Sequence, residues 1–295
     1  MRKEAMPYAA FAGCALIWGS TFLAIRIGND ALPALWACAL RLILAAILLN
    51  GILVASGQRW PKGKALEAAL WYGFLEFAVS LPLLYWAEKA ISSGLAAIVY
   101  AISPVVAMIG SRAMGMEELS PKRLAAAVAA FAGVAVIFWG ELAGKGSVAG
   151  LIAVAIAASC GSMAAVLLRR GPAQSALGAN AVGSTLAVPF SLVATLSLES
   201  SHPMPFTFAR AFPVLYLAVA SSGLAFGLFA WLLGKWQATT VAFLGVIVPV
   251  IAVALGAMVR SERFHVGMLA GAAIVIVSVV VAIRTQPPAV EVVDS

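Results

Sequence analysis

A single carboxylate, Glu76, lies in the middle of the apolar run LWYGFLEFAVSLPLLYW at residues 70–86. A charged side chain at the centre of a membrane-spanning helix costs roughly 2.5 to 3.5 kcal/mol on insertion scales, and such residues are usually functional. Three interpretations are open. Glu76 could take up and release a proton, bind the ammonium group of a solute, or be a structural carboxylate whose charge is compensated by Ser or Tyr hydroxyls or by Arg41 of the preceding apolar run.

Helical periodicity predicts which side chains of this run share the face of Glu76. The inward face should hold Tyr72, Gly73, Glu76, Ser80 and Leu83. The opposite face should hold Leu70, Phe74, Phe77, Leu81 and Leu84. Pro82 removes a backbone hydrogen bond to the turn of Ala78 and so loosens the helix just past Glu76. Pro82 could serve either gating or a structural kink. An interfacial aromatic belt explains Tyr85 and Trp86, near the end of the run, at least as well as a solute site.

Polar and aromatic residues at mid-depth of other apolar runs are further candidates for contact with a solute. Trp18 would give a flat apolar wall, and Ser20 would supply a hydrogen bond. The complete set of substrate-binding candidates is Trp18, Ser20, Glu76, Tyr100, Ser103, Cys160, Ser162, Met163 and Trp231. Pro82, Pro104 and Pro249 are the candidate helix breaks, and such breaks can expose backbone groups to a solute carboxylate. Plain helix packing is the alternative for each of these residues.

The composition is that of an integral membrane protein. Hydrophobic residues make up 63% of the 295 residues, charged residues only 11%, and the mean hydropathy is +1.02. The net charge of +7 is scattered among short loops, which indicates membrane orientation and excludes a nucleic-acid partner. Cys14, Cys38 and Cys160 lie inside apolar runs without metal-ligand spacing, so we expect no metal site and no cofactor, and we interpret all three as small buried hydrophobic side chains.

Apolar runs long enough to span a bilayer predict an all-α fold of ten transmembrane helices. We expect these spans at residues 8–27, 35–55, 66–86, 94–114, 124–140, 148–168, 177–198, 212–234, 239–259 and 266–284. The first run continues past Cys14, which indicates an uncleaved span. Most Lys and Arg residues fall in loops on the side of the N-terminus, so both termini are predicted to be cytoplasmic.

A shift of 145 residues aligns the two halves of the chain. It places Pro104 on Pro249, Glu117 on Glu262, and Trp86 on Trp231. The sequence therefore predicts a duplication of five spans, with one repeat over residues 1–143 and the other over residues 144–295. Because five is odd, the second repeat is inverted in the membrane. Inverted repeats are common in secondary transporters, whose substrate site lies near the midplane between the halves.

Several segments resemble the EamA-type branch of the drug/metabolite transporter superfamily. These are ALIWGSTFLAIRIG, LRLILAAIL, and the pair that begins ISPVVAMIGSRAMGME and IVPVIAVALGAMVRSE. The acidic residue of the third span, followed by a tyrosine, is similar to the YddG-type aromatic amino-acid exporters. The resemblance implies ten helices, an inverted repeat, the bacterial inner membrane, and export of small metabolites such as amino acids. Cys160 departs from it, since many relatives carry an aromatic residue there.

Other functions fit the residues less well. An intramembrane enzyme needs a nucleophile with a base, and both His202 and His265 fall in predicted loops. A channel needs rings of polar groups, and a phosphorylated solute needs several cations at mid-depth, where only Arg41 is found. We therefore expect export of aromatic and hydrophobic amino acids, with a drug or lipophilic-cation exporter as the alternative. The GxxxG of Gly267 and Gly271 fits packing inside the bundle better than a dimer face, so a monomer is expected with a dimer left open.

Overall fold

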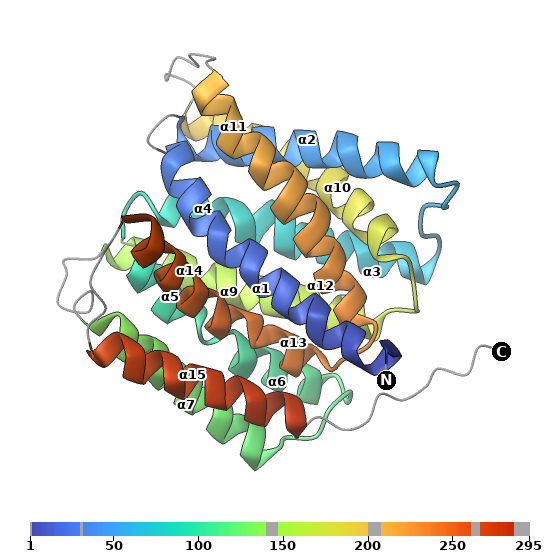
Figure 1. Cartoon of the computed structure of the whole chain (residues 1–295). Coiled ribbons are helices and arrows are strands. Elements are labelled where there is room, and N and C mark those ends of the chain that lie inside the picture. The colour runs from blue at the N-terminus through green and yellow to red at the C-terminus, as the bar shows by residue number, and fades with distance from the viewer. Residues whose placement is uncertain are drawn as a thin grey trace.

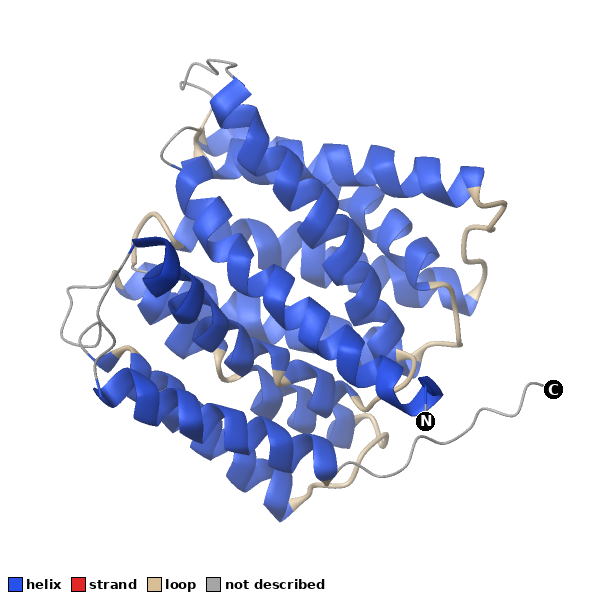
Figure 2. Ribbon diagram, in the orientation of Figure 1, coloured by secondary structure: helices blue, strands red, loops and turns tan. Residues whose placement is uncertain are grey.

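The computed structural model describes residues 2–29, 32–91, 93–139, 147–199, 208–260 and 266–285, and no strand occurs within these ranges (Figures 1 and 2). The helices of the first half are α1 (Arg2–Asn29), α2 (Ala34–Ala55), α3 (Lys64–Gly73), η1 (Phe74–Ser80), α4 (Leu81–Ala87), α5 (Ser93–Tyr100), α6 (Ser103–Ala113) and α7 (Pro121–Ile137). Those of the second half are α9 (Val148–Arg170), α10 (Ala176–Leu198), α11 (Phe208–Tyr216), η2 (Leu217–Ala225), α12 (Phe226–Leu233), α13 (Ala238–Ala242), α14 (Leu244–Arg260) and α15 (Val266–Arg284).

Eight segments of the described chain are long and apolar enough to cross a membrane. They are Ala34–Ala55, Lys64–Ala87, Leu95–Ala113, Val148–Arg170, Ala176–Leu198, Ala211–Leu233, Ala238–Leu255 and Val266–Arg284. The other two predicted spans coincide with α1 and with α7, which has 17 residues. Large apolar side chains such as Ile47, Val128 and Val277 are exposed on the bundle, as expected for a surface that faces lipid. The chain is therefore an all-helical, multi-pass membrane protein.

Two of the spans contain a π-helical segment at mid-length. η1 joins α3 to α4, and η2 joins α11 to α12. Because π turns contain more residues than α turns, they shift the helical register of everything that follows. Our assignment of Phe77, Leu81 and Leu84 to an outward face was wrong for this reason: Phe77 and Leu81 are buried, and Leu81 and Leu84 line the central cavity described below.

Two other spans are interrupted by a short break. One break separates α5 from α6, and the other separates α13 from α14. Pro104 lies in the first turn of α6, where a missing N–H costs nothing, whereas Pro249 lies inside α14. Pro82 likewise begins a helix, in the first turn of α4 directly after η1. The helix therefore departs from regular α geometry around Glu76 and regains it at Pro82.

Glycines bring several helices into backbone contact. α7 and α15 lie side by side at the bottom of the bundle in Figure 1, where a Cβ added at Gly271 would lie 2.5 Å from the Gly133 carbonyl oxygen. A Cβ at Gly73 of α3 would lie 2.3 Å from Cα of Gly183 of α10. Gly271 of the GxxxG pair therefore packs against α7 inside the bundle. Small residues at crossing points are the usual means of close helix approach in membranes.

Charged residues hold the helices together at both ends of the bundle. At the end where α1 begins, Arg123 of α7 forms a 2.9 Å ion pair with Glu117, and its guanidinium also donates to the side-chain oxygen of Gln237. At the opposite end, Glu199 accepts hydrogen bonds from the backbone N–H groups of Leu35 and Trp36 and pairs with Lys89 at 2.9 Å. Glu199 thus satisfies the free donors at the start of α2.

Some predictions concern residues outside the described ranges. These are Glu262, His202, His265 and the boundary between residues 143 and 144. The predicted burial is confirmed for Cys14 and Cys38, which both have 0% exposure, but not for Cys160, which is only partly buried.

Candidate functional site

A cavity of about 130 Å³ lies at the centre of the bundle. Its wall is built from both halves of the chain, by Trp18, Thr21, Ile25, Arg41, Glu76, Leu81, Leu84, Ala97, Tyr100, Ser103, Gly161, Ser162, Ala165, Ser221, Phe226, Phe229, Val241, Ala242, Leu244, Gly245, Val248 and Pro249. Most of these side chains are apolar, with a few hydroxyls, one acid and one base among them. An apolar pocket with a few placed polar groups is typical of a small-molecule site.

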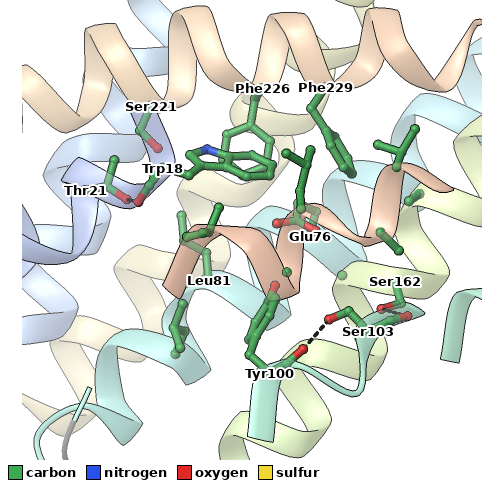
Figure 3. A pocket seen from close by; sticks show the side chains of 18 of the residues that line it. Trp18, Thr21, Glu76, Leu81, Tyr100, Ser103, Ser162, Ser221, Phe226 and Phe229 are labelled. Atoms are coloured by element: carbon green, nitrogen blue, oxygen red, sulfur yellow. Dashed lines mark hydrogen bonds between the residues drawn. The ribbon is translucent and has the colours of Figure 1, made fainter. Parts of the chain in front are cut away.

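Glu76 lies on η1 at the wall of this cavity and is only 7% exposed (Figure 3). Within the described part of the chain, its carboxylate forms no hydrogen bond and no ion pair, and the two ion pairs found there involve other residues. Arg41 is therefore not the direct partner that the structural interpretation requires. A buried carboxylate without such a partner is costly, which favours the interpretations in which a proton or a solute cation neutralises it.

Gly161 of α9 makes room for the carboxylate of Glu76. A Cβ placed at Gly161 would lie 2.8 Å from Oε2 of Glu76, 3.1 Å from the Tyr100 hydroxyl and 3.4 Å from the Ser80 hydroxyl. Three oxygens from η1 and α5 therefore converge on one glycine. A Cβ here would force the Glu76 carboxylate to shift and would crowd the Tyr100 hydroxyl, whereas its contact with Ser80 would be an ordinary one.

Aromatic rings form the wall on one side of Glu76. The ring of Trp18 meets Phe226 edge-on at 5.0 Å and lies 5.2 Å from Phe229, and Figure 3 shows these rings on one side of Glu76 with Tyr100 on the other. Phe77 packs edge-on against Phe226 at 4.7 Å, which fixes that ring from behind. Such a wall suits an apolar or aromatic solute group.

Serine hydroxyls close the break between α5 and α6. Ser103 donates to the carbonyl oxygen of Tyr100 at 2.7 Å, and Ser162 of α9 donates to the carbonyl oxygen of Ser103 at 3.2 Å (Figure 3). Carbonyl groups released by the break are thus satisfied within the protein, as a buried backbone requires. A solute carboxylate would need backbone N–H donors, and those of Ala101, Ile102 and Val105 beside this break already donate to protein carbonyl oxygens.

The cavity wall includes some of the predicted site residues and leaves out others. Those that line it are Trp18, Arg41, Glu76, Tyr100, Ser103, Ser162 and Pro249. Those that do not are Ser20, Cys160, Met163, Trp231, Pro82 and Pro104. The Ser20 hydroxyl lies 2.6 Å from the Tyr216 hydroxyl, Met163 packs against Gly110 of α6, and Trp231 packs against the apolar core.

Several residues of the cavity wall were not among the predicted ones. Thr21 follows Ser20 directly, and one step along a helix turns a side chain by about 100°. Ser221, Phe226 and Phe229 lie on η2 and α12, and the paired serines in an otherwise apolar run were the signal that could have identified this region. Tyr85, for which an interfacial belt was one of two interpretations, is not part of the wall, but it is 1% exposed and accepts a hydrogen bond from Arg41.

The described residues contain no group of three or more His, Cys, Asp or Glu side chains that could hold a metal ion. The chemistry available in the cavity is therefore that of one carboxylate, one guanidinium, several hydroxyls and an apolar wall. This set can bind and orient a small solute.

Comparison with known proteins identifies the family. The profile of the EamA-like transporter family matches residues 6–139 and again residues 144–284. The chain belongs to this family. It is accordingly a transporter and not an enzyme, with a small-molecule substrate and with membrane lipid around it.

Bacterial proteins are among the relatives of this EamA-like transporter. It is 27% identical over 272 residues to the "Probable amino-acid metabolite efflux pump" of Salmonella typhimurium, covering 88% of this chain and 89% of that protein. It is 33% identical over 117 residues to the "Uncharacterized inner membrane transporter YedA" of Escherichia coli, covering 39% of this chain and 38% of that protein. The similarity to an inner membrane transporter, together with the apolar helices, places this chain in the bacterial inner membrane. A crystal structure 19% identical in sequence superposes with a TM-score of 0.77 over 94% of this chain and 96% of that one, which shows the same fold.

Proposed function

We propose that this protein is a secondary transporter that exports amino acids, aromatic and hydrophobic ones first, across the bacterial inner membrane. The observation that carries the proposal is the central cavity, where a buried acid without a partner among the described residues faces an aromatic wall. The acid suits an ammonium group, and the wall suits an apolar side chain. One chain builds the whole cavity, so the monomer is the functional unit in this proposal.

The transport cycle in this proposal is alternating access between two inverted repeats of five spans each, residues 1–143 and 144–295, with both termini cytoplasmic. The two matches to the family profile support the duplication, since each covers about half of the chain. The pairing of η1 with η2 supports it too, because each π segment occupies the middle of the corresponding span. Rocking of two such halves around a fixed midplane site is a known plan for secondary transport.

The contacts at the ends of the bundle are the candidate gates in this cycle. Glu117 and Arg123 belong to the first half, whereas Gln237 and Thr239 belong to the second, and the Thr239 N–H donates to Glu117. At the other end, Glu199 of the second half holds Leu35 and Lys89 of the first. Movement of one half against the other would break one of these sets at a time.

The name of a relative supports amino acids as the proposed substrates. The Salmonella typhimurium protein is named a probable amino-acid metabolite efflux pump, and it aligns with most of this chain. Glu76 then serves either as the site of the coupled proton or as the ligand of the substrate ammonium. The lipophilic-cation alternative uses the same acid and the same wall, so an experiment must separate the two.

Transport by the purified protein in liposomes tests the proposal. Vesicles with and without an imposed pH gradient are given labelled phenylalanine, leucine, glutamate or a lipophilic cation. We expect movement of phenylalanine and leucine, faster with the gradient than without it, and little movement of glutamate. Movement of the lipophilic cation with none of the amino acids would overturn the proposal and favour a drug exporter.

A further inference from the structure

Arg41 is the second buried charge of the cavity, and it lies on α2 with only 2% exposure. Its guanidinium donates three hydrogen bonds, from Nη2 to Ser221 at 2.8 Å, from Nε to Ser222 at 2.9 Å and from Nη1 to the Tyr85 hydroxyl at 3.2 Å. All three acceptors are neutral hydroxyls. The side chain is therefore held between α2, α4 and η2 by three hydrogen-bond acceptors that carry no charge.

No carboxylate pairs with Arg41 among the described residues, where the ion pairs are Lys89 with Glu199 and Arg123 with Glu117. A guanidinium has five N–H donors, and three of them are used here. The Tyr85 ring, whose centroid lies 6.0 Å from the guanidinium carbon, gives only a weak cation–π contact. Burial of an unpaired charge is costly, so the two unused N–H donors of Arg41 favour the binding of an anion.

The cavity is the place from which an anion can reach Arg41, because Arg41 and its acceptor Ser221 both line it. Glu76 lines the same cavity. The cavity wall thus carries one cation and one anion that are not paired with each other. An α-amino acid carries the complementary pair of charges, and a planar guanidinium is the preferred partner of a carboxylate.

We propose that Arg41 and Ser221 form a carboxylate subsite, so that the cavity selects zwitterionic solutes over lipophilic cations. The solute carboxylate binds the guanidinium, its ammonium group faces Glu76, and its side chain contacts Trp18 and Phe226. The proposal rests on the proposed transport function and adds which charge the solute must carry.

A set of four competitors tests the subsite in the wild-type protein. Phenylalanine, phenylalaninamide, phenethylamine and 3-phenylpropionate share one aromatic side chain but differ in their charges. Each competes with labelled phenylalanine for transport in liposomes. We expect phenylalanine to compete at least tenfold better than the amide and the amine, which lack the carboxylate. Equal competition by phenylalanine and its amide would overturn the subsite and leave amino-acid transport intact.

Substitutions at Arg41 and Tyr85 locate the discrimination. Arg41→Gln should reduce the preference for phenylalanine over its amide to about threefold or less, and Arg41→Lys should reduce it partly, because an ammonium group lacks the planar fork. Tyr85→Phe removes one acceptor but keeps the guanidinium, so it should reduce the preference less than Arg41→Gln does. An unchanged preference in a folded Arg41→Gln protein would contradict the proposal. If no amino acid moves and a lipophilic cation does, the proposed function fails together with the subsite.

Discussion

Arg41 and Ser221, 180 residues apart in the sequence, are joined by a 2.8 Å hydrogen bond from the guanidinium Nη2 to the serine Oγ. The bond connects α2 of the first half with η2 of the second, and both residues border the central cavity. Glu76 occupies the corresponding place on η1. The two π segments therefore each carry a polar group of the cavity, and π turns inside helices occur often at functional sites.

Glu76 is expected to be essential for transport and not for folding. Glu76→Gln keeps the shape of the side chain but can no longer carry a negative charge, so transport of labelled phenylalanine in liposomes should fall at least tenfold and lose its response to a pH gradient. Glu67→Gln is the matched control, because Glu67 lies on α3 of the same span and is exposed. A Glu76→Gln protein with wild-type transport and wild-type pH response would leave Glu76 a structural role only.

The two ion pairs should differ in their contribution to stability. Arg123 and Glu117 are both buried, so Arg123→Gln leaves an unpaired carboxylate and should lower the free energy of unfolding by about 3 to 5 kcal/mol. Lys89 has a side chain that is 48% exposed, and the buried Glu199 keeps the backbone N–H donors of Leu35 and Trp36, so Lys89→Gln should cost less, about 1 kcal/mol. Denaturant unfolding of both variants in the same detergent micelles measures the two values. Equal losses would contradict the assignment of the buried pair as the stronger contact.

The two glycines of the GxxxG should respond differently to alanine. A Cβ at Gly271 would meet backbone atoms of Gly133 and Ile137 on α7, so Gly271→Ala should cost about 1 to 3 kcal/mol of stability. At Gly267 the nearest atom lies at 3.9 Å, so Gly267→Ala should change stability by about 0.5 kcal/mol or less. Thermal unfolding of the two purified variants compares them. If Gly267→Ala proved the more harmful substitution, the packing of α15 on α7 described above would be incorrect.

The helices and the charged residues of the cavity could be predicted from the sequence because the bilayer restricts both. A span must be apolar over about 20 residues, and an acid or a base inside such a run is rare enough to be noticed at once. Glu76 and Arg41 were identified in this way, and both line the cavity. The groups that compensate the charges of Glu76 and Arg41 could not be predicted, because they depend on distances between helices. The composition of a single apolar segment does not encode these distances.

The π segments could not be predicted, because a π turn needs no particular residue. The run FLEFAVS of η1 contains neither Gly nor Pro, and regular helical periodicity therefore assigned Phe77 and Leu81 to the wrong face. Ser221 was missed for a related reason. A serine in an apolar helix usually bonds to a carbonyl of the preceding turn, and only the folded chain shows that Ser221 accepts a bond from Arg41 instead.

Alanine at Gly161 tests most directly whether the cavity is the transport site. Its Cβ would displace the carboxylate of Glu76 and crowd the hydroxyl of Tyr100. Gly227→Ala in α12 is the control, because nothing lies within 4 Å of its Cβ position. In liposomes, we expect Gly161→Ala to move labelled phenylalanine at least tenfold more slowly than the wild type, and Gly227→Ala to match the wild type. Wild-type transport by a folded Gly161→Ala protein would contradict the account.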